Sequence, residues 1–329
     1  MRATRLIAPA LFAACLFAFA PACDVGGLDP VGDPDPDPDP DPDPDPGDVD
    51  VSGEITGSVT WTGTVNLTAN ATIMQGADVT IMPNTRFYGA QGAWLEVAGS
   101  ITVAGSEAEP AVFAPAEGAG GWAGIKVLAG GSASVSHADV TQSAVFLRCE
   151  TGATLCEIAD SNLHMIGKAV EIYAPATIDR TTINEMNNAG VTIGAGGDLT
   201  ITDSVLLQSS HDLIVMSGGS LSMTYSSIGG AQSSYEHCNY HIGSADSIVV
   251  TDSIIGSSVY GIMLGNIDGS VWTNNNFTEN NPGNDVLDLG GVTNADMRQN
   301  YWDQGAPAPG AGYDTSTPLA APNPSAGPR

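Results

Sequence analysis

Basic residues are scarce in this chain. Its 329 residues include 9 Lys and Arg against 37 Asp and Glu, which leaves a formal net charge of −28 at pH 7. Two of the bases, Arg2 and Arg5, lie at the very start of the chain. So acidic a surface repels phosphate backbones and anionic headgroups. We therefore expect no nucleic-acid partner and no charge-driven binding to a membrane.

Long apolar runs and cysteines are also scarce. After residue 23 no stretch is long and apolar enough to span a bilayer. Only three of the 5 cysteines, Cys149, Cys156 and Cys238, fall in the body of the chain. Charged residues make up only 14% of the chain, while Gly and other small residues are abundant. This composition favours an extracellular protein over a cytosolic one.

The first residues, "MRATRLIAPALFAACLFAFAPAC", have the three parts of a secretory signal: a basic start, an apolar centre and a small-residue end. We predict a signal peptide over residues 1–22. Two cleavage sites compete. Ala20-Pro21-Ala22 fits an ordinary signal peptidase, while the same residues followed by Cys23 resemble a bacterial lipobox, in which the cysteine carries the lipid. The second interpretation is favoured, and it predicts an outer-membrane or cell-surface protein anchored through Cys23; the first predicts a secreted one.

Residues 23–50 are acidic and rich in Asp-Pro pairs, with eleven acids and no base after Cys23. Such a segment cannot bury a core, and Pro at alternate positions favours extended polyproline II geometry. We predict a disordered tether. Calcium loops also space Asp two residues apart, but an EF-hand needs Gly at its sixth position, where this run has Pro. Calcium stays a possible cofactor, and we assign no other.

The body of the chain is a repeat. A pattern of apolar, any, polar, Ser/Thr/Asn, any and apolar residue recurs, as in "IADSNL" (158–163), "ITDSVL" (201–206) and "VTDSII" (250–255). Its copies are about 23 residues apart, and their apolar positions alternate with period 2. We predict an all-β solenoid over residues 51–303, with two or three short strands in each rung. Its Ser/Thr/Asn column should hydrogen-bond along the stack: Ser161, Thr181, Ser204, Ser226, Ser253, Asn275, Asn300.

Three further segments carry a family resemblance. They are "GADVTIMPNTRFYGAQGAWLEVAGSITVAGSEAEPAVFAP", the following "GGWAGIKV" and the closing "NYWDQ". With the repeat, they resemble the right-handed parallel β-helix repeat proteins of the pectin-lyase-like superfamily over residues 55–303. Asn84 and Asp303 stand where that family usually has Gly. The resemblance implies a right-handed parallel β-helix, but it leaves the function open, because such proteins range from carbohydrate lyases and hydrolases to adhesins.

One column of the repeat holds the best enzyme-like residues. Asp160 and Asp203 should lie two rungs apart, about 10 Å, near the spacing of an inverting carboxylate pair, with Arg180 between them. Asp252 continues the column. These four are weak catalytic candidates, because the favoured interpretation is an exposed charge ladder in which Arg180 neutralises the acids one rung above and below it. The motifs of pectate-lyase-type and polygalacturonase-type sites are absent from the chain.

The longest rungs contain extra residues, and insertions in solenoids often form the binding face. The segment "GGAQSSYEHCNYH" (229–241) supplies the binding-loop candidates Tyr235, His237, Tyr240 and His241. With Cys238 and His211, these histidines suggest a transition-metal site. Surface histidines around a buried cysteine are the favoured interpretation, so we assign no metal.

The pairing of two cysteines is left open, and one further prediction concerns the end of the chain. Cys149 and Cys156 either pair as a disulfide in an oxidising compartment or fill the core as small residues. Residues 304–329, rich in Pro, Ala and Gly, show no pattern and are predicted to be a disordered tail.

Two hypotheses for the function follow. The first is a non-enzymatic, lipid-anchored bacterial surface protein whose rod-like body has a structural role or binds a polysaccharide or a surface or matrix protein. The second is a polysaccharide lyase or glycoside hydrolase that uses Asp160, Asp203, Asp252 and Arg180. The lack of family motifs favours the first.

Overall fold

The computed structural model describes residues 47–231, 237–310 and 312–329. The predicted signal peptide, Cys23 and most of the predicted tether lie outside the described residues. All regular elements in the described part are β-strands. This part holds no helix that is long and apolar enough to cross a membrane.

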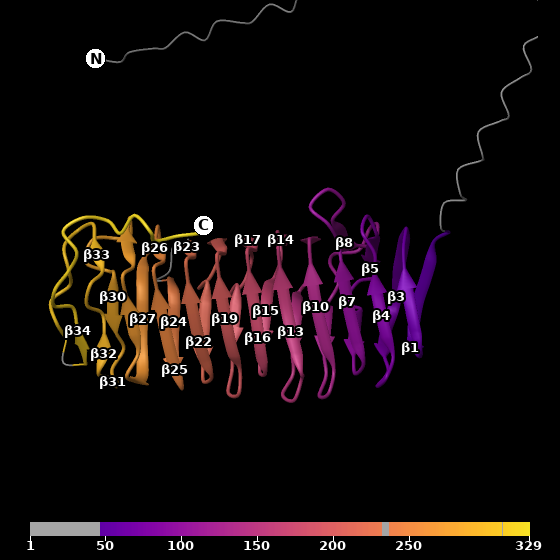
Figure 1. The fold of residues 1–329 in the computed structure, drawn as a ribbon, viewed down its shortest axis with the longest axis horizontal. Coiled ribbons are helices and arrows are strands. Elements are labelled where there is room, and N and C mark those ends of the chain that lie inside the picture. Colours follow the sequence, from indigo (N-terminus) through magenta and orange to yellow (C-terminus); the bar gives the residue numbers. More distant parts are fainter. Residues whose placement is uncertain (1–46, 232–236, 311) are drawn as a thin grey trace, which may run out of the picture. The chain divides into compact units, whose positions relative to one another are not determined.

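The strands stack in three parallel columns along one axis, from β1 at the indigo end to β34 at the yellow end (Figure 1). The first column is a 12-stranded sheet: β2 (Ser58–Trp61), β4 (Asp78–Ile81), β7 (Ser100–Ala104), β10 (Ser132–Ser136), β13 (Leu155–Ala159), β16 (Pro175–Asp179), β19 (Asp198–Thr202), β22 (Ser220–Thr224), β25 (Ser247–Thr251), β28 (Val271–Thr273), β32 (Ala295–Asp296) and β34 (Tyr313–Asp314).

The other two columns form a 22-stranded sheet, because the long strands β1 (Val49–Ile55) and β3 (Thr64–Ile73) run through both. The second column continues with β5 (Arg86–Gly89), β8 (Ala111–Pro115), β11 (Ala138–Thr141), β14 (Asn162–His164), β17 (Thr182–Met186), β20 (Val205–Ser209), β23 (Ser227–Ala231), β26 (Ile254–Gly256), β29 (Asn276–Thr278) and β33 (Tyr301–Trp302). The third has β6 (Trp94–Val97), β9 (Gly124–Val127), β12 (Val145–Cys149), β15 (Lys168–Ile172), β18 (Val191–Ile193), β21 (Ile214–Ser217), β24 (Cys238–Ser244), β27 (Tyr260–Asp268), β30 (Val286–Asp288) and β31 (Val292–Thr293).

The predicted parallel β-helix is confirmed, with three strands in a typical rung. The first apolar column of the repeat stacks in register, Val135 on Ile158, Ile158 on Ile178 and Ile178 on Ile201. The last apolar column does the same from Val140 to Trp302. Both columns are buried in one continuous core. The right hand is the one that twisted strands favour for parallel crossovers.

The predicted polar column lies at the bend between the first and second strand columns. Each side-chain oxygen accepts a hydrogen bond from a backbone N–H of the preceding rung, at 2.8 to 3.4 Å, from Ala138 N with Ser161 to Asn275 N with Asn300. Each hydroxyl in turn donates to the carbonyl two residues earlier, as Ser204 does to Thr202 at 2.7 Å. The column therefore completes backbone pairing where the chain turns and strand pairing is interrupted.

The residue just before each member of this column has a positive φ. Every position of the predicted catalytic column is included, with φ between 43° and 61°: His137, Asp160, Arg180, Asp203, Tyr225, Asp252, Asn274 and Gln299. Asn84 has φ 59° as well, so Asn replaces Gly at a turn that Asn tolerates. The column is defined first by backbone geometry: each rung bends through one left-handed residue here.

The end of the chain, predicted from the sequence to be a disordered tail, makes specific contacts with the stack. β34 extends the first sheet beyond β32, and the segment that follows runs back along the stack past β26 and β23 (Figure 1). Asn323 exchanges backbone–side-chain hydrogen bonds with Asn276 at 2.8 and 2.9 Å. The Arg329 guanidinium lies 3.1 Å from the ring centroid of Tyr225. These contacts join segments that are far apart in the sequence, so no local sequence pattern predicts them.

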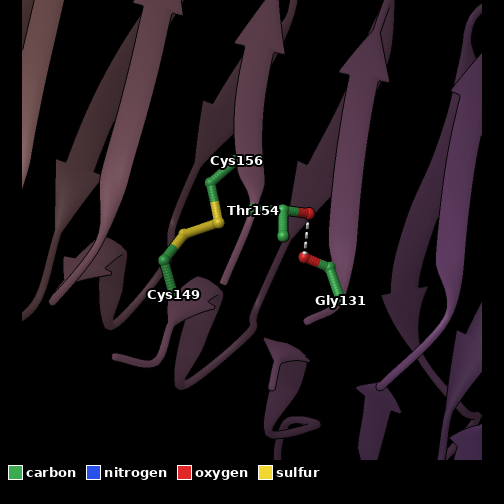
Figure 2. The surroundings of a disulfide bond; sticks show 4 residues. All are labelled: Gly131, Cys149, Thr154 and Cys156. Atoms are coloured by element: carbon green, nitrogen blue, oxygen red, sulfur yellow. Dashed lines mark hydrogen bonds between the residues drawn. A yellow bond between two sulfur atoms is a disulfide. The ribbon is translucent and has the colours of Figure 1, made fainter. Parts of the chain in front are cut away.

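A disulfide joins Cys149 at the end of β12 to Cys156 in β13, across the turn between two rungs (Figure 2). Both cysteines are also buried in the core. In the same turn the Thr154 hydroxyl donates to the Gly131 carbonyl of the preceding rung at 2.8 Å. Cys238 is a free, buried cysteine.

Candidate functional site

The four catalytic candidates form a row along the stack, and their polar atoms already have partners. Arg180 holds Asp160 through two hydrogen bonds, Nε to Oδ1 at 2.6 Å and Nη2 to Oδ2 at 2.8 Å, and also contacts Asp179. The hydrogen bond from Arg180 keeps the pKa of Asp160 below its ordinary value, although partial burial opposes this. Asp160 is therefore a paired carboxylate, poorly suited to act as a general acid.

The other two acids of the row contact the C-terminal segment. Asp203 Oδ1 accepts the backbone N–H of Arg329 at 3.2 Å, and Asp252 Oδ1 accepts the Asn323 amide at 3.2 Å. The ion pairs of Arg180 within the described residues are to Asp160 and Asp179, so the predicted bridge from Arg180 to Asp203 is not formed. Only the Asp160 half of the expected charge ladder is formed, and a catalytic role for these residues stays a prediction.

The binding-loop candidates divide into three groups. Tyr235 lies outside the described residues. Tyr240, predicted to face a ligand, is instead fully buried, because β24 alternation turns it inward against Trp272, with ring centroids 5.0 Å apart. His237 and His241 do come together, around Asp212, a residue that the sequence pattern does not mark.

Asp212 lies in the turn between β20 and β21, and its side chain is only 2% exposed. The pairing of β21 with β24 sets Ile214 beside Tyr240, which brings Asp212 next to Cys238, each two residues earlier. Five polar atoms surround its carboxylate. Cys238 contributes its backbone N–H at 3.0 Å and its thiol at 3.2 Å, both to Oδ1. The Nδ1 atoms of three histidines complete the set: His211 at 3.1 Å, His237 at 3.3 Å and His241 at 3.1 Å.

These contacts decide the charge of the carboxylate. Burial alone would raise the pKa of Asp212, but the backbone and thiol hydrogen bonds from Cys238 and the charges of His241 and His211 together hold it below its ordinary value. The same burial, with the nearby Asp212 carboxylate, raises the pKa of the Cys238 thiol. The centre of the cluster is thus an ionised carboxylate beside a protonated thiol.

Two sets of side chains in this cluster have metal-ligand chemistry. One is His211, Asp212 and His237; the other is Asp212, Cys238 and His241, and within each set the ligand atoms lie within 4.8 Å of one another. The sequence identified the histidines and the cysteine. It missed Asp212 because nothing in the repeat pattern marks it; the one available signal is that Asp212 and Cys238 each stand two residues before a buried strand position.

A groove lies beside the cluster, at the turns between the second and third strand columns. Its wall is lined by Gln91, Gly92, Trp122, Gln142, Met165, Glu185 and Asn187, among others. It ends one rung from the cluster, where the Gly190 N–H donates to the Asp212 carbonyl at 3.2 Å. Sequence reasoning missed this groove. The structure shows that a second row of left-handed residues lines it, which includes Gln142, Met165 and Glu185.

Comparison with known proteins adds little to this geometry. No family model matches the chain, and no curated protein matches it. Among solved structures, the chain is similar to the A-module of the mannuronan C-5 epimerase AlgE4 from Azotobacter vinelandii, with 11% sequence identity and a TM-score of 0.47 over 84% of this chain and 90% of that one. A likeness of this size carries no inference about activity, and the fold stands on the strand pairings described above.

Proposed function

We propose that the chain is an exported, lipid-anchored bacterial surface protein whose β-helix binds a glycan along its lateral groove and does not cleave it. The observation that carries this proposal is the groove itself, which crosses several rungs and is lined by apolar and polar groups, with Glu185 as the charged residue among them. Stacked rungs repeat about every 4.8 Å, so such a surface suits an extended, repetitive ligand.

The chemistry of the groove fits a polysaccharide. The amides of Gln91, Gln142 and Asn187 supply both donors and acceptors for hydroxyl groups. Met165 is 47% exposed and offers an apolar surface to the less polar face of a sugar ring. Glu185 and the overall charge of −28 disfavour uronate polymers. The ligand class we propose is therefore a neutral polysaccharide.

A matched pair of variants tests the groove. Gln91 and Asn187 are both exposed, so the double variant Gln91→Ala/Asn187→Ala should fold normally and lose binding to any glycan that the wild type retains on an array. Thr200→Ala removes an exposed polar side chain from β19 in the first column and should keep binding unchanged. Equal binding by all three proteins contradicts the assignment of the groove.

The anchor is tested independently of the groove. Lipidation at Cys23 should add diacylglyceryl mass to the mature N-terminus and place the protein in the membrane fraction. Cys23→Ser should release it. An unmodified cysteine in the mature protein contradicts the anchor and leaves a secreted rod.

The alternative function, a polysaccharide lyase or glycoside hydrolase, is favoured by one observation. Asp212 and its histidines lie one rung from the groove, and clusters of titratable groups beside a groove are typical of active sites. Reducing-end and unsaturated-uronate assays on a polysaccharide panel with and without calcium distinguish the two functions. Products that depend on the histidine cluster would establish the enzyme.

A further inference from the structure

We infer that His211, Asp212 and His237 form a binding site for one divalent transition-metal ion of the zinc type. This site goes beyond glycan binding and does not depend on it. The three residues come from the β20–β21 turn and from the residue before β24, so neighbouring rungs bring them together.

The distances fit a coordination shell. Zinc bonds of about 2.0–2.1 Å to nitrogen and oxygen in a tetrahedron place neighbouring ligand atoms about 3.3 Å apart. The Nδ1 atom of His211 is 3.1 Å from Asp212 Oδ2, and that of His237 is 3.3 Å from the other oxygen, Oδ1. One ligand atom from each of the three residues lies within 4.8 Å of the other two, so a small shift of the side chains closes the shell around one ion. The two imidazole rings lie side by side, with centroids 4.1 Å apart. The same spacing serves a hydrogen bond when no ion is bound, so little rearrangement is needed for binding.

The other neighbours of the Asp212 carboxylate fix its orientation. Cys238 donates its backbone N–H to Asp212 Oδ1, and His241, on the same strand β24, contacts Oδ2 at 3.1 Å. A metal-binding carboxylate is usually oriented by such outer hydrogen bonds. With Asp212 almost fully buried, its orientation is set before any ion arrives, which lowers the ordering cost of binding.

The ligand types select the class of ion. Two imidazoles and one carboxylate suit Zn²⁺ and its first-row neighbours, whereas Ca²⁺ and Mg²⁺ prefer sites made of oxygen. The side chain of His211 is 51% exposed, so one side of the site is open to solvent and can take water or a ligand atom. The second set, with Cys238, is less open, since Cys238 is 0% exposed and its histidine, His241, is 40% exposed. The open set is therefore the one we assign.

The test is a metal titration of the full-length mature protein carrying no histidine tag. After treatment with a chelator and dialysis against Zn²⁺, elemental analysis should find one ion per chain, and Co²⁺ should produce the absorption bands of a low-coordinate site with nitrogen and oxygen ligands. His211→Gln and His237→Gln should each abolish stoichiometric binding. His241→Gln should weaken it by about 10- to 100-fold, as loss of an outer partner does.

A matched control comes from the chain itself. His164 pairs with Asp139 at 3.1 Å in the second column, away from the cluster, and His164→Gln should keep full binding. Circular dichroism confirms folding of each variant. Less than half an ion per chain in the wild type, or unchanged binding in both His211→Gln and His237→Gln, overturns the proposal. Two results together would overturn the ligand assignment: a thiolate charge-transfer band in the Co²⁺ form of the wild type, and loss of binding in Cys238→Ser. They would assign the ion to the set of Asp212, Cys238 and His241.

Discussion

Asp212 shows at the scale of one residue how a buried charge is maintained in this fold. A carboxylate removed from water is costly unless polar partners surround it, and here its own turn and the following rung supply them. His211, His237, His241 and Cys238 all face the carboxylate. The residue is therefore tied both to the stability of two rungs and to any chemistry at the end of the groove.

The first prediction concerns Asp212→Asn. The Asn amide keeps the shape of the carboxylate, but its NH2 group then faces the N–H and S–H donors around it. We therefore expect a loss of about 2–4 kcal/mol in the free energy of unfolding at neutral pH. Because the folded-state pKa of Asp212 is lowered, its contribution is fully present above the ordinary Asp value of about 3.9 and is lost as pH falls through the lowered pKa. Urea denaturation should show the gap between wild type and variant constant near pH 5 and shrinking below about pH 4. A gap that widens as pH falls contradicts the lowered pKa.

Asp203 shows, also at the scale of one residue, that a column of polar residues can be determined by backbone conformation and not by catalytic chemistry. Its φ is 48°, like that of its neighbours in the row. Asp and Asn tolerate this region, and Gly adopts it freely, but a β-branched residue does not.

We expect Asp203→Val to destabilise the protein by about 1–3 kcal/mol through backbone strain. Asp203→Gly, which also removes the carboxylate and its bond to Arg329, should cost less than about 1 kcal/mol. Chemical denaturation of the two variants separates strain from lost contacts. Equal destabilisation by Val and Gly would show that the carboxylate, not the backbone, decides the position.

At the scale of the element, the buried polar column controls how one rung joins the next. Ser204 accepts the Thr181 N–H at 3.1 Å and lies fully buried. Repeat proteins transmit stability between neighbours, so damage at one turn should be felt in the adjacent rungs.

The third prediction is that Ser204→Ala destabilises the protein by about 1–3 kcal/mol, because the buried Thr181 N–H loses its acceptor. Hydrogen exchange should quicken first at Thr181 and in the rungs around it. Ser222→Ala, at an exposed position of β22, should stay within about 0.5 kcal/mol. Unchanged exchange at Thr181 contradicts the role of the column.

The disulfide also joins neighbouring rungs. It closes a short loop, with a sequence separation of 7 between Cys149 and Cys156. From loop entropy we expect reduction to cost about 2–3 kcal/mol. Urea denaturation with and without dithiothreitol measures this, and the Cys149→Ala/Cys156→Ala variant should not respond to the reductant. An equal response in that variant would place the effect at Cys238.

The repeat pattern predicted elements better than it predicted sites, for a physical reason. Stacked apolar columns repeat because every rung must bury the same face, so Ile158, Ile178 and Ile201 revealed strand, register and core together. Asp212 and the groove arise from turns that differ from rung to rung. The contact of Asn323 with Asn276 spans 47 residues and has no periodic signature. The third strand of each rung was only partly visible, because its apolar runs are short.

At the scale of the whole molecule, the protein is an acidic stack with one groove and one histidine cluster that we assign to function. The C-terminal segment covers part of the left-handed row, where Asp203 and Asp252 lie, so that face is partly used within the molecule. The groove lies at a different turn and is where we place the ligand. A tethered rod of this kind presents its lateral surface, and the proposed Cys23 anchor would hold it at the cell surface.

One measurement tests the central claim most directly: a panel of neutral and acidic polysaccharides incubated with the mature protein, read for both retained complex and released product. We predict saturable binding to at least one neutral polysaccharide, lost in Gln91→Ala/Asn187→Ala and kept in Thr200→Ala, with no new reducing ends or unsaturated uronates. Product that forms in the wild type and disappears in Asp203→Ala or His237→Gln contradicts the account and makes the protein an enzyme.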